Sequence, residues 1–88
     1  MISTNTTITT TPTRLLTRSN SYRTIYIHVL GNGTVYLGGA DVTSANGMVT
    51  QKHAVPLELY IPAEEELWAV VAESTEQLRL LTPEYYAD

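Results

Sequence analysis

The chain has 88 residues, a formal net charge of −4 and no cysteine. This length fits one domain, and a domain of this size buries only about 60–65% of the surface of its unfolded chain. The absence of cysteine excludes disulfides, and two histidines, His28 and His53, do not suffice for a structural zinc site. Small domains of this kind commonly gain stability by assembling with copies of themselves or with a larger partner.

The charges are unevenly divided along the chain. Residues 1–57 hold four basic residues and one acidic residue (+3), whereas residues 58–88 hold one arginine and eight acidic residues (−7). A nucleic-acid-binding surface needs clustered basic side chains, so the composition argues against nucleic acid as a partner. The acidic half can orient a contact between copies or with a protein partner, although a solvated acidic surface is the simpler explanation.

The sequence shows no targeting or membrane segment. Met1 to Asn5 lack the basic and apolar regions of a signal peptide. The apolar run that contains Trp68 to Ala72 is far too short to span a membrane. We therefore expect a soluble protein, made in the cytoplasm, with no membrane partner.

Residues 1–13 are dominated by threonine, with Ile2 and Ile8 as apolar anchors. Threonine is β-branched and favours an extended backbone. Because Pro12 cannot donate to a sheet, the segment is predicted to be an extended arm or a weakly paired edge strand. Such an arm often becomes ordered only against another subunit.

The middle of the chain shows the alternation of half-buried strands. In residues 22–30, the β-branched Ile25, Ile27 and Val29 share one face and are predicted to enter the core. The turn 31–33 contains Asn-Gly and is predicted to be a hairpin turn with positive φ angles. The strand that follows places Val35 and Leu37 inward. Gly38-Gly39 then permit a bulge or a sharp corner, ahead of a polar turn segment that ends at Gly47.

The second half continues in the same way. Residues 57–61 alternate apolar and polar side chains and stop at Pro62. For 67–72 we favour a buried strand over a helix, because the residues are β-favouring and turn residues follow. A last strand over 76–81 turns Leu78 and Leu80 inward.

These elements predict an all-β fold, either a small antiparallel β-sandwich or a jelly-roll-like barrel of about seven to eight short strands, with an extended N-terminal arm. The corresponding organisation is an arm or edge strand over 1–13, a sandwich domain over 14–82 and a C-terminal tail over 83–88. The tail holds Tyr85 and Tyr86, and packing their aromatic rings against another surface would remove apolar area from water.

No group of residues forms a catalytic, cofactor-binding or metal motif. His28 lies on the strand face opposite the isoleucines, and no serine stands in a strained Gly-x-Ser-x-Gly turn. The acidic run 64–66 cannot converge on one cation from a single turn. Neither glycine turn is followed by a helix or by a P-loop lysine. An enzyme is therefore not expected, nor are a cofactor and a metal.

Aromatic residues are the remaining candidates for function. Tyr22, Tyr26, Tyr36 and Trp68 could form a stacking platform for sugars or bases. Because the sequence offers no basic groove, it gives little support to a platform that binds nucleic-acid bases. Protein–protein contact suits these amphipathic rings at least as well.

The segment from Gly33 to Gly47 and those at 57–61, 66–70 and 77–81 resemble small virion proteins of tailed bacteriophages, and the resemblance covers roughly residues 5–82. It departs at Met48 to His53, where such proteins tend to have an apolar residue and a glycine-containing turn. The resemblance implies a structural, non-enzymatic capsid decoration (cement) or minor head protein. Its partners would be the major capsid protein and copies of itself, as a homotrimer on the capsid surface of the virion, after synthesis in the host cytoplasm. The alternative is a neck, tail or head-fibre module that binds a receptor or carbohydrate.

The sequence and the resemblance together indicate nine residues as candidates for an interface: Ile2, Ile8, Arg14, Arg18, Tyr22, Tyr26, Trp68, Tyr85 and Tyr86.

Overall fold

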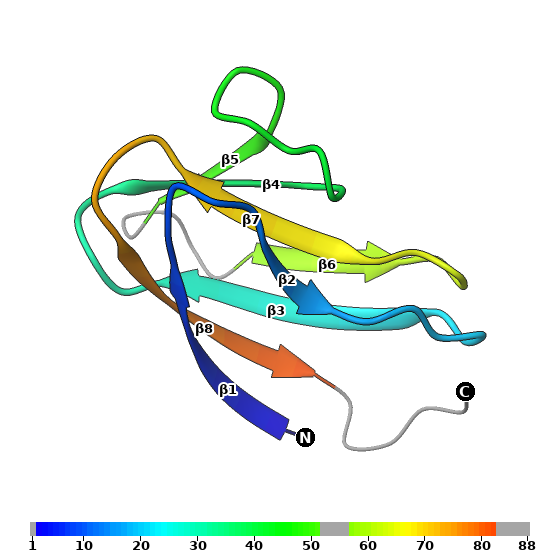
Figure 1. Cartoon of the computed structure of the whole chain (residues 1–88). Helices are drawn as coiled ribbons and strands as arrows, with labels where there is room; N and C mark the ends of the chain where they lie inside the picture. The colour runs from blue at the N-terminus through cyan, green and yellow to red at the C-terminus, as the bar shows by residue number, and fades with distance from the viewer. Residues whose placement is uncertain (1, 52–56, 83–88) are drawn as a thin grey trace.

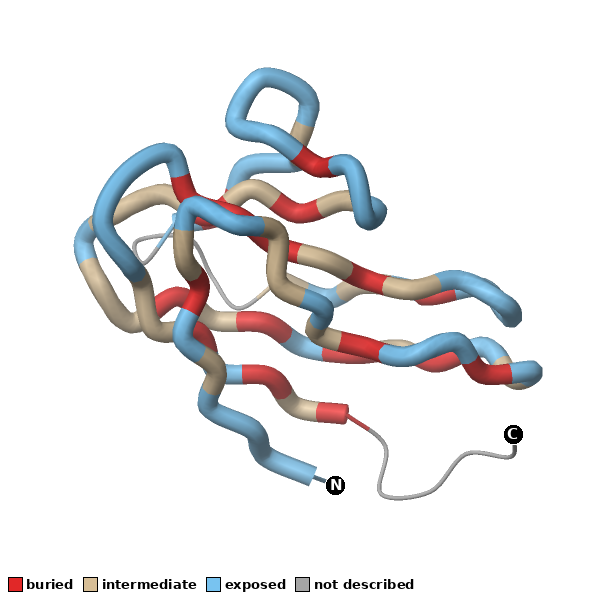
Figure 2. The backbone as a smooth tube through the Cα atoms, viewed as in Figure 1, coloured by how far each residue is buried: buried red, intermediate tan, exposed pale blue. Residues whose placement is uncertain are grey.

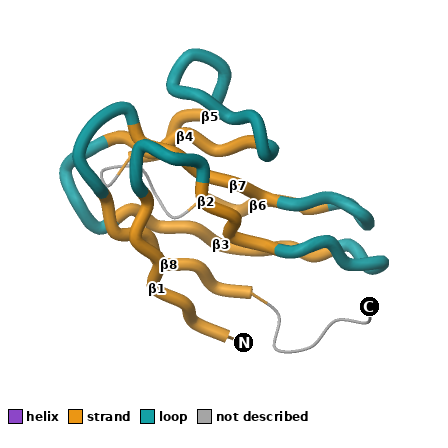
Figure 3. The backbone as a smooth tube through the Cα atoms, viewed as in Figure 1, coloured by secondary structure: helices purple, strands orange, loops and turns teal. Residues whose placement is uncertain are grey.

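The computed structural model describes residues 2–51 and 57–82, and over these ranges the chain forms eight strands and no helix (Figure 1). The strands are β1 (Ile2–Ile8), β2 (Thr13–Leu16), β3 (Arg23–Val29), β4 (Thr34–Gly38), β5 (Met48–Gln51), β6 (Leu57–Ile61), β7 (Leu67–Val71) and β8 (Glu76–Thr82). Loops and turns join them (Figure 3). The predicted all-β fold is confirmed.

The strands form two four-stranded antiparallel sheets. Sheet A has the order β1-β8-β3-β6 and sheet B the order β2-β7-β4-β5. The pairings are nested, with β1 on β8, β2 on β7, β3 on β6 and β4 on β5. This is the pattern of one long hairpin wound into two sheets, the jelly-roll form of the β-sandwich.

The core lies between the two sheets and follows the alternation of the sequence (Figure 2). The three predicted core residues of β3, Ile25, Ile27 and Val29, have at most 1% of their surface exposed. β4 and β8 also bury alternate side chains, and β7 is buried at every position except Trp68. The predicted inward residues of β4 and β8 are also buried: Val35, Leu37, Leu78 and Leu80.

The turn at residues 31–33 differs from the prediction. It joins β3 of sheet A to β4 of sheet B, so it is a connection between sheets and not a hairpin turn. No glycine in the described residues has a positive φ. Glycine fits here because the Glu76 carboxylate lies against this turn, and a Cβ on Gly31 or Gly33 would overlap it unless that side chain moved. The Gly33 N–H donates to Glu76 Oε2 at 3.0 Å.

The loop from Gly39 to Gly47 is a polar turn segment, as the sequence predicted. The amide of Thr43 donates to Asn46 Oδ1 at 2.7 Å, and Gly47 donates to the Thr43 carbonyl at 2.9 Å. The loop turns Val42 inward, leaving it 3% exposed. A Cβ on Gly38 or Gly47 would lie 2.9 Å from Val42 Cγ2, so both positions need glycine for close approach.

Of the residues predicted to be an arm or an edge strand, Ile2–Ile8 form β1 at the edge of sheet A. β1 pairs in register with β8 along its whole length, from Ile2 opposite Thr82 to Ile8 opposite Glu76. Pro12 lies outside the ladder, in the connection to β2. The other edge of β1 has no paired strand among the described residues.

Candidate binding face

Alternate side chains of sheet A point away from the core and form one continuous surface, which we call the outer face of sheet A. Cross-strand pairing sets its rows. One row holds Asn5, Arg79 and His28, and the next holds Ser3, Leu81, Tyr26 and Glu58. A third row places Thr24 beside Tyr60. Residues from the two ends of the chain thus meet on this face.

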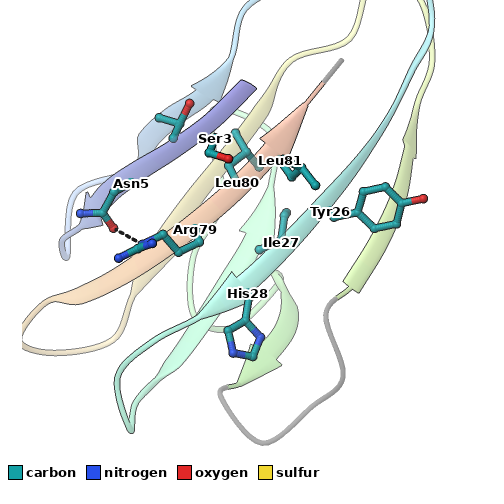
Figure 4. A pocket seen from close by; sticks show the side chains of 9 residues that line it. Ser3, Asn5, Tyr26, Ile27, His28, Arg79, Leu80 and Leu81 are labelled. Atoms are coloured by element: carbon teal, nitrogen blue, oxygen red, sulfur yellow. Dashed lines mark hydrogen bonds between the residues drawn. The ribbon is translucent and has the colours of Figure 1, made fainter. Parts of the chain in front are cut away.

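A shallow groove of about 380 Å³ runs across β1, β8 and β3 on this side (Figure 4). Each of these strands lines it with three consecutive residues, centred on Thr4, Ile27 and Leu80. Tyr26 and Arg79 are exposed, whereas His28 and Leu81 are half-buried. The groove therefore combines an aromatic ring, an aliphatic side chain and polar groups, which is the usual make-up of a ligand-binding surface.

A ladder of hydrogen bonds holds the polar side chains between β1 and β8. Arg79 Nε donates to Asn5 Oδ1 at 3.3 Å, drawn in Figure 4. Asn5 Nδ2 donates to Gln77 Oε1 at 3.1 Å, and Gln77 Nε2 donates to Thr7 Oγ1 at 2.7 Å. Because each side chain is held by the next, ligand binding would order few additional rotamers.

On the other side of β3, Tyr26 donates its hydroxyl proton to Glu58 Oε2 at 2.8 Å. This hydrogen bond and the negative charge of Glu58 raise the pKa of Tyr26 above its ordinary value of 10.0. The interaction holds the ring leaning from β3 toward β6, at the margin of the groove, whereas Arg79 leans toward β1 (Figure 4).

The aromatic surface continues beyond the groove. The rings of Tyr22 and Tyr60 lie 5.5 Å apart at a tilt of 32°, and both residues are more than half exposed. Such pairs favour tilted or offset geometries. Together with Tyr26, they place three tyrosines on this side of sheet A.

Trp68 does not join these tyrosines. It lies on β7 in sheet B, between Arg14 of β2 and Gly38 of β4. Its indole Nε1 donates to Glu66 Oε1 at 3.1 Å, and Arg14 Nη1 is 3.6 Å from Glu66 Oε2. A single aromatic platform of Trp68 and tyrosines, as the sequence suggested, is therefore not formed, because alternation and sheet order place Trp68 and Tyr26 on opposite outer faces.

The remaining interface candidates are scattered. Ile2 is 44% exposed near the start of β1, and Arg18 lies 4.0 Å from Glu64 in a surface ion pair. Ile8 has no exposed surface and belongs to the core, so it offers no contact surface in the folded domain. Tyr85 and Tyr86 lie outside the described residues.

Sequence reasoning missed the partners that complete the outer face of sheet A. Asn5 and Arg79 are 74 positions apart, and Tyr26 and Glu58 are 32 apart. Outward positions could be read from the alternation of each strand, but their grouping needed the strand order. His28 was correctly predicted to face away from the core isoleucines, as its position on the outer face shows.

Comparison with known proteins identifies no relative. No protein-family model matches the chain, and neither a curated protein nor a solved structure is significantly similar to it. Within residues 2–51 and 57–82, no cluster of three or more metal-ligating side chains occurs, and no helix could cross a membrane.

Proposed function

We propose that the chain is a structural virion protein, a capsid decoration (cement) protein that binds the outer surface of a phage head and stabilises contacts between capsomers. The resemblance to small virion proteins of tailed bacteriophages supports this proposal. Its partners are the major capsid protein and copies of itself, arranged as a homotrimer on the capsid surface. The protein is made in the host cytoplasm and has no enzymatic role.

The observation that carries the proposal is the open edge of β1. This strand ends sheet A, and its outer edge is unpaired within the described part of the chain. Ile2 and Thr4 belong to the strand face that turns inward further along, yet both are exposed. An extended strand of a neighbour can add to such an edge through main-chain hydrogen bonds.

The architecture is compatible with this role. Jelly rolls occur in viral capsid domains and in lectins, so the fold supports a virion protein by analogy. Many copies on a repeating lattice need only modest individual affinity, because neighbouring contacts raise the effective concentration of each copy.

The test uses heads of the phage that encodes the chain, prepared without it. Purified protein should cosediment with these heads, and mass spectrometry with cryo-electron microscopy should find hundreds of copies per particle. A copy number of a few to tens would instead favour the alternative of a neck, tail or head-fibre module that binds a receptor or carbohydrate. No cosedimentation at all would overturn attachment to the head.

A pair of variants tests the route of attachment. Thr4→Lys places a charge beside the open edge of β1, and charges on edge strands oppose strand addition. Gln51→Lys makes the same change on β5, at the edge of sheet B. We expect only Thr4→Lys to weaken capsid binding and trimer formation, measured by cosedimentation and light scattering. Equal behaviour of the two variants would refute the β1 route.

A further inference from the structure

We propose that the groove on the outer face of sheet A binds a saccharide that bears a carboxylate. The guanidinium of Arg79 binds this carboxylate, and a sugar ring stacks on the ring of Tyr26. The groove includes residues 3–5 of β1, but its ligand contacts outward side chains, whereas strand addition uses the free main-chain edge of that strand. The inference therefore does not depend on capsid attachment, and either can fail without the other.

The shape of the groove suits an oligosaccharide. Its volume of about 380 Å³ lies within the range of small-molecule sites, which is roughly 300–1,000 Å³. It is shallow and runs across three strands (Figure 4), so a ligand can extend past it toward Tyr22 and Tyr60. An extended, partly solvated ligand fits such a surface better than a compact apolar molecule.

Arg79 provides the charge that selects an acidic ligand. Among the described residues, Arg14 and Arg18 each lie beside a carboxylate, and Arg23 is buried with its guanidinium on the carbonyls of Thr17 and Glu65. Arg79 alone is exposed on a sheet face with an amide oxygen as its partner.

The bond from Nε to Asn5 leaves both Nη groups of Arg79 for a ligand. Two parallel N–H donors match the two oxygens of a carboxylate, and such charge-assisted pairs are the stronger hydrogen bonds of proteins. His28, the cross-strand neighbour of Arg79, adds an imidazole on the far side of the same row.

The other residues that line the groove can pack against a sugar ring and form hydrogen bonds with its hydroxyl groups. One face of a pyranose carries C–H groups that pack on an aromatic ring or an aliphatic side chain, here Tyr26 and Leu81. Its hydroxyl groups need donors and acceptors, which Ser3, Asn5 and His28 supply. Tyr26 is held by Glu58 and Arg79 by Asn5, so the site is formed before the ligand arrives.

A nucleic acid fits this face less well. Its binding draws on several phosphate contacts, whereas Arg79 is the only arginine or lysine of the described residues on this face. The carboxylate of one sugar residue needs one guanidinium. An acidic peptide shares the anionic contact, and the experiment separates it from a saccharide.

The experiment is an NMR titration of the ¹⁵N-labelled full chain with 3′-sialyllactose, with a glucuronic acid oligosaccharide and with lactose as the neutral control. We expect saturable shifts of β1, β3 and β8 amides with at least one acidic sugar and much weaker shifts with lactose. Arg79→Ala should weaken binding roughly tenfold or more, since a charged hydrogen-bond partner is lost. Arg79→Lys should restore it only in part.

Matched variants separate the contributions. Tyr26→Phe keeps the ring and should keep most of the affinity, whereas Tyr26→Ala should lose it. Arg18→Ala removes another exposed arginine, away from the groove, and should bind as the wild type does. Dispersed spectra of each variant confirm that the fold is intact.

Several results would overturn the inference. These are an absence of saturable binding to either acidic sugar, equal binding of lactose, shifts confined to sheet B, and unchanged affinity in Arg79→Ala. Shifts of the groove amides with an acidic tyrosine-containing peptide, but with no saccharide, would assign the groove to a protein partner instead.

Discussion

The contact between Gly33 and Glu76 predicts that Gly33→Ala destabilises the wild type but stabilises a variant that lacks the Glu76 carboxylate. An ideal Cβ on Gly33 would lie 2.9 Å from Glu76 Cδ and 3.1 Å from Cγ, and its three nearest atoms all belong to Glu76. Gly33→Ala should therefore displace the carboxylate and break its hydrogen bond with the Gly33 amide. Since the φ angle of Gly33 is not positive, alanine itself is compatible with the backbone there.

The magnitude follows from two opposing effects. A hydrogen bond to a charged group contributes about 1.5–3 kcal/mol to the free energy of unfolding. Replacing glycine by alanine at a compatible position stabilises by about 0.4–1 kcal/mol, because the unfolded chain loses conformational freedom. Gly33→Ala should thus cost about 0.5–2.5 kcal/mol in the wild type. In a Glu76→Ala background, the same change should stabilise by about 0.4–1 kcal/mol.

Urea denaturation of the wild type, the two single variants and the double variant measures this coupling, with circular dichroism and Trp68 fluorescence as independent probes. Gly39→Ala is the control, because a Cβ there meets only Asp41 Oδ1 at 3.6 Å, an ordinary contact. If the two changes are additive to within about 0.5 kcal/mol, the carboxylate is not the reason for glycine at this turn.

Two further predictions concern β1 and the outer face of sheet A. Ile8→Ala should lower the free energy of unfolding by about 2–5 kcal/mol and speed hydrogen exchange in β1, because Ile8 has no exposed surface. Ile2→Ala should change the free energy of unfolding by less than about 0.5 kcal/mol. Urea denaturation and hydrogen exchange measure both effects. Glu58→Gln should bring the pKa of Tyr26 back toward 10.0, as followed by NMR titration. Because the folded-state pKa is raised, the contribution of Tyr26 to stability is complete below pH 10 and is lost as the pH rises through the folded-state pKa, a loss that should shrink in Glu58→Gln.

Local patterns in the sequence were enough to find β3, β4, β6, β7 and β8 and their buried sides, but not β2 and β5. The alternation of Ile25, Ile27 and Val29 depends only on the two-residue period of an extended backbone, so it needs no knowledge of neighbours. The same holds for Leu78 and Leu80, which are buried as predicted. The polar turn ahead of Gly47 was also predictable, because its bonds join residues two to four positions apart.

The residue types in the turns predicted the connections between strands less reliably than alternation predicted the buried sides. Asn-Gly between two strands is a strong hairpin signal, yet β3 and β4 belong to different sheets. The requirement for glycine at positions 31 and 33 comes from Glu76, more than forty residues away, and not from backbone angles. A local rule cannot detect a neighbour that arrives from the far end of the chain.

The sequence by itself determined an all-β domain, the inward side of each main strand and the absence of a recognisable catalytic motif. Only the tertiary structure decided that the strands wind into a jelly roll, that Trp68 and Tyr26 lie on opposite outer faces, and that Asn5 and Arg79 share one groove. The physical reason is that side-chain alternation is a property of each strand alone, whereas strand order and register depend on which buried faces pack together across the whole chain.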